Sequence, residues 1–83
     1  MKPMIFQGSK NIIYSRIKEA RKNLGMTQEE LAGKMQTLGV NIDQQMISKI
    51  ENNNRIVTDF ELKCFSIALK VDVLYLLQDF KLS

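Results

Sequence analysis

The chain has 83 residues, 45% of them hydrophobic, and a formal net charge of +3. This length fits one small domain with a single core of modest stability, and the hydrophobic share excludes a chain that is disordered throughout. No apolar run approaches the roughly 20 residues of a membrane span, and the N-terminus lacks the layout of a signal peptide. The positive charge permits nucleic-acid binding without establishing it.

Histidine is absent from the sequence, and Cys64 is its one cysteine. An internal disulfide is therefore excluded, which fits a reducing cytoplasm. Cys64 itself is expected to be a small core residue. The commonest zinc sites and Ser–His catalytic arrangements are also excluded. We expect no metal, no cofactor and no catalytic residues, and no small-molecule ligand is evident.

The first nine residues show no hydrophobic period. One interpretation is a flexible N-terminal arm, residues 1–9, that precedes a folded domain of residues 10–83. The alternative is that residues 4–6, Met-Ile-Phe, are apolar because they pack on this domain or on a partner. The sequence leaves the role of the arm unassigned.

A first helix is expected over residues 11–24. Its apolar residues fall on one face, and they are Ile13, Ile17, Ala20 and Leu24. Gly25 follows as the C-cap. Arg16 and Lys18 lie away from the apolar face and are candidates for contacts to DNA phosphates.

Two helices joined by a connector are expected next. Thr27 and Glu30 form a capping box at the start of the first of them. Apolar residues then recur at helical spacing until Gly39, which stands where a left-handed C-cap is needed. Asp43 is the expected N-cap of the second helix, which spans about residues 43–52.

The helix over residues 43–52 has two contrasting faces. Ile47 and Ile50 form a narrow apolar stripe, and the opposite stripe is polar and almost uncharged. Side chains with both donors and acceptors are what a helix needs to read base edges in the DNA major groove. The expected base-reading residues are Gln44, Gln45, Ser48 and Lys49.

The C-terminal part of the chain predicts two more helices. A second capping box, Thr58 with Glu61, starts a helix that extends to Leu69 and has apolar residues on two faces, which predicts burial on two sides. The last helix begins after Asp72. Its apolar residues would leave an exposed patch in a monomer, and a dimer contact is the economical explanation. The expected interface residues are Ile67, Leu74, Tyr75 and Phe80.

Two motifs, one after the other in the sequence, resemble those of a known protein family. The motif Thr-Gln-Glu-Glu-Leu-Ala (residues 27–32), followed by Ile-Ser-Lys-Ile-Glu (residues 47–51), resembles the helix-turn-helix of the phage Cro and repressor proteins and their XRE-like bacterial relatives. The likeness covers about residues 13–77. It implies an all-α, five-helix, lambda-repressor-like domain. It also implies a cytoplasmic, sequence-specific transcriptional regulator of bacterial or phage origin, of the repressor type.

The resemblance also implies roles for particular residues. Family members pair the arginine equivalent to Arg21 with the glutamate that ends the recognition helix, here Glu51; the alternative is two independent surface charges. In the family the loop after that helix lies along the DNA backbone, so Asn52 and Arg55 are candidate phosphate contacts. Gln28, at the amide-rich start of the preceding helix, is a further candidate phosphate contact.

The chain departs from the commonest family pattern at two places. The connector before the recognition helix is about five residues longer than in the tight form, and Val40 and Ile42 look like apolar plugs in it. Longer connectors also occur in the family. After the recognition helix, Asn53 is expected to replace the glycine that relatives have, because asparagine tolerates left-handed backbone.

The function implied by these features is binding to double-stranded DNA as a homodimer on an inverted-repeat operator. The alternative is a protein-binding adaptor or antitoxin-type module that uses the apolar surface of the last two helices. An enzyme is not expected, since no nucleophile–base pair stands out in the sequence.

Overall fold

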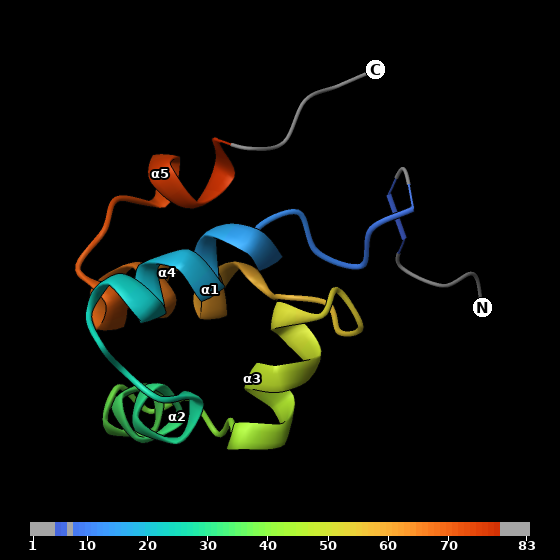
Figure 1. The fold of residues 1–83 in the computed structure, drawn as a ribbon. Helices are drawn as coiled ribbons and strands as arrows, with labels where there is room; N and C mark the ends of the chain where they lie inside the picture. The colour runs from blue at the N-terminus through green and yellow to red at the C-terminus, as the bar shows by residue number, and fades with distance from the viewer. Residues whose placement is uncertain (1–4, 7, 79–83) are drawn as a thin grey trace.

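A computed structural model of the protein describes residues 5–6 and 8–78, and this part of the chain contains five α-helices (Figure 1). In chain order they are α1 (Tyr14–Asn23), α2 (Gln28–Thr37), α3 (Gln44–Glu51), α4 (Asp59–Leu69) and α5 (Val73–Leu77). The all-α, five-helix fold predicted from the sequence is confirmed. None of these helices is long and apolar enough to cross a membrane.

The helices are arranged in layers around α1 and α4, which pack on each other in the middle of the molecule (Figure 1). On one side α2 and α3 contact each other, with α2 packed on α4 and α3 packed on α1. On the opposite side α5 packs on both α1 and α4. α3 therefore lies on the side of the domain away from α5.

Side-chain caps fix where three of the helices begin. The Thr27 hydroxyl accepts a hydrogen bond from the amide of Glu30, whose carboxylate accepts one from the amide of Thr27. Thr58 and Glu61 form the same capping box at α4, and the Asp43 side chain caps α3. Each cap satisfies amides that lack a partner inside the helix. The predicted starts of these helices are confirmed.

The first helix begins later and its last residues are more exposed than predicted. It begins at Tyr14 rather than at residue 11, because Asn11 Oδ1 accepts a hydrogen bond from the amide of Ile13 at 3.1 Å and holds the chain in a turn. At the other end Leu24, expected on the buried face, is 45% exposed. The chain reverses there at Gly25, whose φ of 65° favours glycine.

One apolar core lies between the helices. It is formed by Ile13, Ile17, Ala20, Met26, Leu31, Ala32, Met35, Val40, Ile42, Ile47, Ile50, Phe65, Ala68, Leu69 and Leu76. Val40 and Ile42 are buried plugs in the connector, as predicted. From α5, Leu76 is fully buried and Leu77 is half-buried. Asp72 precedes α5 but makes no side-chain capping hydrogen bond.

The two apolar faces predicted for α4 have different surroundings. Phe65 and Leu69 are fully buried on the core side. On the other face Phe60 and Ile67 are 57% and 51% exposed, and Cys64 is half-buried. The prediction of burial on two sides is therefore wrong for a single chain. Within the described part of the chain, no element buries Phe60 and Ile67 on this second face.

Candidate nucleic-acid interface

α3 presents opposite faces to the core and to solvent. Ile47 and Ile50 are fully buried. Gln44, Gln45 and Lys49 are exposed, and Ser48 is half-buried. Because residues four apart lie on the same side of a helix, these polar side chains share one face. The predicted base-reading residues thus form a single accessible polar surface, on a helix held by its apolar side.

A buried ion pair fixes the C-terminal end of α3 against α1. Arg21 Nε donates to Glu51 Oε2 at 2.7 Å, and Arg21 Nη2 donates to Glu51 Oε1 at 2.9 Å. The side chains of Arg21 and Glu51 are only 11% and 2% exposed. The hydrogen bonds to Glu51 raise the pKa of Arg21, against the opposing effect of burial. Arg21 Nη1 also donates to the carbonyl of Met26 at 2.8 Å, which ties in the turn before α2.

Gln28, at the start of α2, joins the same buried pair. Its side-chain amide donates to Glu51 Oε1 at 3.1 Å. The side chain expected near a phosphate is therefore engaged inside the protein. A phosphate at this end of α2 would meet the backbone amides of the first turn instead, which is the usual way a helix N-terminus binds an anion, although the amide of Glu30 already donates to the Thr27 hydroxyl.

The loop after α3 turns at Asn53. This residue has a φ of 61°, as expected for an asparagine in the place of a glycine. The amide of Asn53 donates to the carbonyl of Ile50 at 3.1 Å, and the amide of Asn54 donates to the carbonyl of Lys49 at 2.7 Å, so these two carbonyls near the end of α3 have partners. Asn52, a predicted phosphate contact, is exposed at this end of α3.

Arg55, the basic residue of the loop, is bound within the protein. Its Nη1 and Nη2 atoms donate to Glu61 Oε1 and Oε2 at 3.0 and 2.9 Å, a bidentate arrangement. The carboxylate of Glu61 also accepts the amide of Thr58 in the capping box of α4. One carboxylate thus holds both the loop and the helix that follows it. A DNA phosphate would have to share Arg55 with Glu61.

We expect Glu61→Gln to lower the free energy of unfolding by about 1–3 kcal/mol at neutral pH, because the variant lacks the charged partner of Arg55. Burial by itself would raise the pKa of Glu61. The hydrogen bonds from Arg55 and Thr58 lower this pKa by more than burial raises it, so the folded-state pKa lies below the ordinary value of 4.5. The stabilisation is therefore present above about pH 4.5 and is lost as the pH falls through the folded-state pKa.

Urea unfolding of the parent and of Glu61→Gln at neutral pH and near pH 3 measures this dependence. The stabilities of the two proteins should converge in acid. Glu29→Gln is the matched control, since it removes an exposed carboxylate from the first turn of α2, and it should stay within about 0.5 kcal/mol of the parent. An equal loss for Glu61→Gln at both pH values would contradict the role of its charge.

The two basic candidates on α1 have different surroundings. Lys18 is exposed. Arg16 donates to Glu19 Oε2 at 2.9 Å, and its guanidinium carbon lies 4.8 Å from the centre of the Tyr75 ring. The Tyr75 hydroxyl donates to the same Glu19 carboxylate, which raises the pKa of Tyr75. Arg16 is therefore positioned against α5, and it ties α5 to α1.

The predicted dimer residues are only partly accessible. Ile67 and Leu74 are 51% and 75% exposed, and Leu74 is the most exposed of the large apolar side chains described. Tyr75 is half-buried in its contact with α1. Phe80 lies outside the described residues. Of the predicted interface residues that the structure describes, Ile67 and Leu74 are therefore the exposed ones.

Asn11 is a structural residue that the sequence analysis missed. Its side chain is buried, and its Nδ2 atom donates to the carbonyls of Ile50 and Arg55, each at 3.0 Å. An asparagine just before a helix is a common turn signal, and this signal could have indicated the late start of α1. Its two acceptors, however, lie near the end of α3 and in the loop that follows it, 39 and 44 residues further along the chain, and no local pattern points to them.

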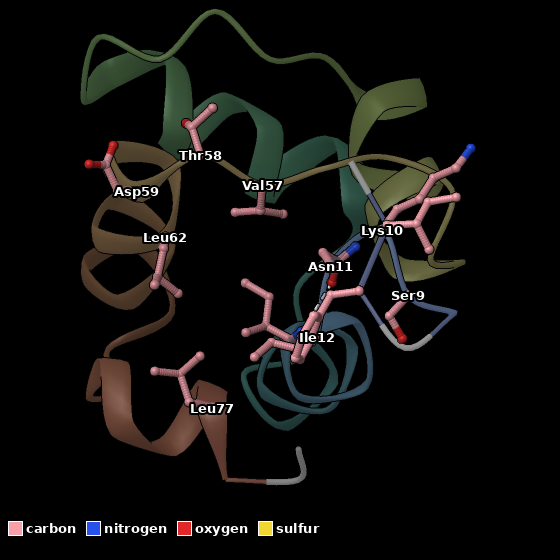
Figure 2. Close-up of a pocket in the computed structure, with 12 residues that line it drawn as sticks. Ser9, Lys10, Asn11, Ile12, Val57, Thr58, Asp59, Leu62 and Leu77 are labelled. Atoms are coloured by element: carbon pink, nitrogen blue, oxygen red, sulfur yellow. Dashed lines mark hydrogen bonds between the residues drawn. The ribbon is translucent and has the colours of Figure 1, made fainter. Parts of the chain in front are cut away.

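An apolar cleft of about 660 Å³ lies between the N-terminal segment and the α4–α5 side of the domain (Figure 2). Its apolar walls are formed by Ile5, Phe6, Ile12, Val57, Leu62 and Leu77, among others. Ile5 and Phe6, which the sequence analysis placed in the arm, border the cleft and are still about half exposed. The chain turns after them through two backbone hydrogen bonds between Phe6 and Ser9. Met4 lies outside the described residues.

Comparison with known families agrees with this geometry. A helix-turn-helix family model matches residues 17–76, from the middle of α1 into α5. The match includes α2, α3 and the loop that follows, which are the parts of the predicted interface described above. No curated protein matches the chain.

Proposed function

Because the chain belongs to the Cro/repressor-type, XRE-like helix-turn-helix family of DNA-binding transcription regulators, we propose that it is a repressor that reads the DNA major groove with α3. The observation that supports this most directly is the accessible polar face of α3. Gln44 and Gln45 are suited to bidentate contacts with adenine, and Lys49 is suited to guanine O6 and N7. Ser48 can contact either purine from the same face.

Phosphate contacts would hold α3 in register along the groove. We assign them to the backbone amides at the start of α2, to Asn52 in the loop, and to Lys18 on α1. Arg16 is bound to Glu19 and Arg55 to Glu61. We therefore propose that Arg16 positions α5 and that Arg55 positions the loop.

A salt titration against duplex DNA tests this proposal. The operator can be obtained by selecting bound duplexes from a random pool. The logarithm of the affinity should fall linearly with the logarithm of the salt concentration, with a slope of about −0.9 for each phosphate neutralised. An unrelated duplex of the same length should bind about 10³-fold more weakly or worse. A chain that enriches no sequence from the pool and binds without salt dependence would contradict the proposal.

We further propose that the repressor is a two-fold dimer through the surface that carries Ile67 and Leu74. Two copies would present their α3 helices to half-sites about 34 Å apart, and the operator would be an inverted repeat. The large exposed fractions of these two apolar side chains support an interface at this surface. α5, which carries Leu74, lies on the side of the domain away from α3 (Figure 1), so a contact made through α5 would leave the polar face of α3 accessible.

Leu74→Glu is expected to convert the dimer to a monomer, because burying a carboxylate without a partner in the interface is costly. Sedimentation velocity at micromolar concentration, for the chain alone and on its operator, measures this change. The matched control is Leu38→Glu, which places the same charge on an exposed leucine at the end of α2 and should sediment like the parent. A parent that is monomeric in both states would exclude the dimer. A Leu74→Glu variant that dimerises normally would exclude this surface as the dimer interface.

A further inference from the structure

Two asparagine side chains fasten the N-terminal segment to the loop that follows α3. Asn53 Oδ1 accepts hydrogen bonds from the amides of Lys10 and Asn11, at 2.9 and 3.2 Å. Asn11 reaches in the opposite direction, and its Nδ2 atom donates to the carbonyls of Ile50 and Arg55. We call this reciprocal pair, Asn11 and Asn53, the asparagine clasp. It joins segments that lie about forty residues apart in the sequence.

Nearly all the polar side-chain atoms of the clasp form hydrogen bonds within the protein, and these bonds hold the two segments together. Asn11 is 7% exposed, its Nδ2 atom has two acceptors, and its Oδ1 atom accepts the amide of Ile13. A buried amide with these partners is costly to displace, since any shift of the segment leaves polar groups without hydrogen bonds. The left-handed backbone at Asn53 aims its side chain at this segment.

Lys10 is brought by the clasp to the C-terminal end of α3. Its amide is bonded to Asn53, while its side chain is exposed. Lys10 is one of the residues that line the apolar cleft, and Figure 2 shows its ammonium group extending outward from it, whereas Ile12 and Leu77 point into it. The clasp therefore places the backbone of Lys10 beside Asn53 in the loop of residues 52–55, and the basic side chain starts from there.

A cation at this place has a physical use. The C-terminal end of a helix carries a partial negative charge, which disfavours a nearby phosphate. The loop has its own arginine, Arg55, but that side chain is bound to Glu61. Lys10, supplied from the other end of the domain, would offset the unfavourable field at the end of α3.

We propose that Lys10 binds a phosphate of the DNA backbone and that Asn11 and Asn53 are positioning residues for this contact. This inference rests on the proposed DNA binding and extends the interface to a segment before α1, outside the family match at residues 17–76.

The first test is Lys10→Ala in salt titrations on the selected operator and on an unrelated duplex. The variant should lose affinity by the same factor on both duplexes, about fivefold to tenfold near 0.1 M salt, and its log–log slope should become shallower by about 0.9. Lys34→Ala is the matched control. It removes an equal charge from an exposed lysine of α2 that lies near Lys70, at the end of α4, and its slope should equal that of the parent.

The second test combines Lys10→Ala with Asn53→Gly. Glycine adopts the positive φ of this position readily, so the variant keeps the turn and loses only the side chain that accepts from Lys10 and Asn11. Thermal unfolding checks that Asn53→Gly is folded at the temperature of the binding assay. In this background Lys10→Ala should change the affinity less than twofold.

The possible outcomes distinguish a failure of this inference from a failure of the proposed function. A parent that binds DNA with a normal salt slope, beside a Lys10→Ala variant that is identical to it, would overturn the inference and leave the proposed function intact. An unchanged loss from Lys10→Ala in the Asn53→Gly background would overturn the positioning role of the clasp. A parent that binds no duplex would overturn both.

Discussion

Glu51→Ala should lower the free energy of unfolding by about 3–5 kcal/mol, the typical cost of leaving one partner of a buried ion pair uncompensated. The Arg21 side chain, which is 11% exposed in the parent, would then have lost the carboxylate beside it. The hydrogen bonds to Glu51 raise the pKa of Arg21, and an arginine does not escape this cost by losing its proton. Gln28 would lose an acceptor as well.

A double-mutant cycle with Arg21→Ala isolates the pair. The combined variant should be more stable than the sum of the two single losses indicates, because it contains no stranded charge. Urea unfolding of the four proteins gives the coupling free energy. The matched control is the cycle of Arg16 and Glu19, an ion pair in which the Glu19 side chain is 51% exposed, with an expected coupling of at most about 1 kcal/mol. Additive losses at Arg21 and Glu51 would show that the pair does not hold α3.

Alanine at Gln44, Gln45 or Lys49 should weaken binding to the selected operator by about 1–3 kcal/mol each and change binding to an unrelated duplex little. The reason is that these side chains project from α3 away from the buried Ile47 and Ile50. Removing them takes away contacts to base edges and leaves the fold intact.

Fluorescence anisotropy titrations on the two duplexes measure the change in specificity. Lys34→Ala is again the control for the loss of one positive charge, and its affinities for the two duplexes should change by the same factor or not at all. Unfolding curves should show all three α3 variants within about 0.5 kcal/mol of the parent, as expected for surface substitutions. If all three variants bind the selected operator like the parent, α3 is not the reading helix.

Several elements of the fold were predictable because their causes lie within one helical turn. The capping boxes at Thr27 and Thr58 need only a glutamate three residues later. The left-handed turn at Asn53 follows from the backbone preferences of that residue type. The two faces of α3 follow from the helical period, which separates apolar from polar side chains whatever the helix packs against.

The tertiary structure alone decided which charged and polar side chains are available to a partner. Arg55 was predicted to be a phosphate contact, but its guanidinium is bound to Glu61, the same residue that closes a capping box. Arg16 lies against Tyr75 of α5, and Asn11 bonds to carbonyls at the end of α3. The contacts of Arg16 and Asn11 join residues from distant parts of the chain, and their geometry exists only after the core has fixed the helices in place. Local periodicity therefore determined the elements and their faces, while packing determined which side chains the protein uses internally.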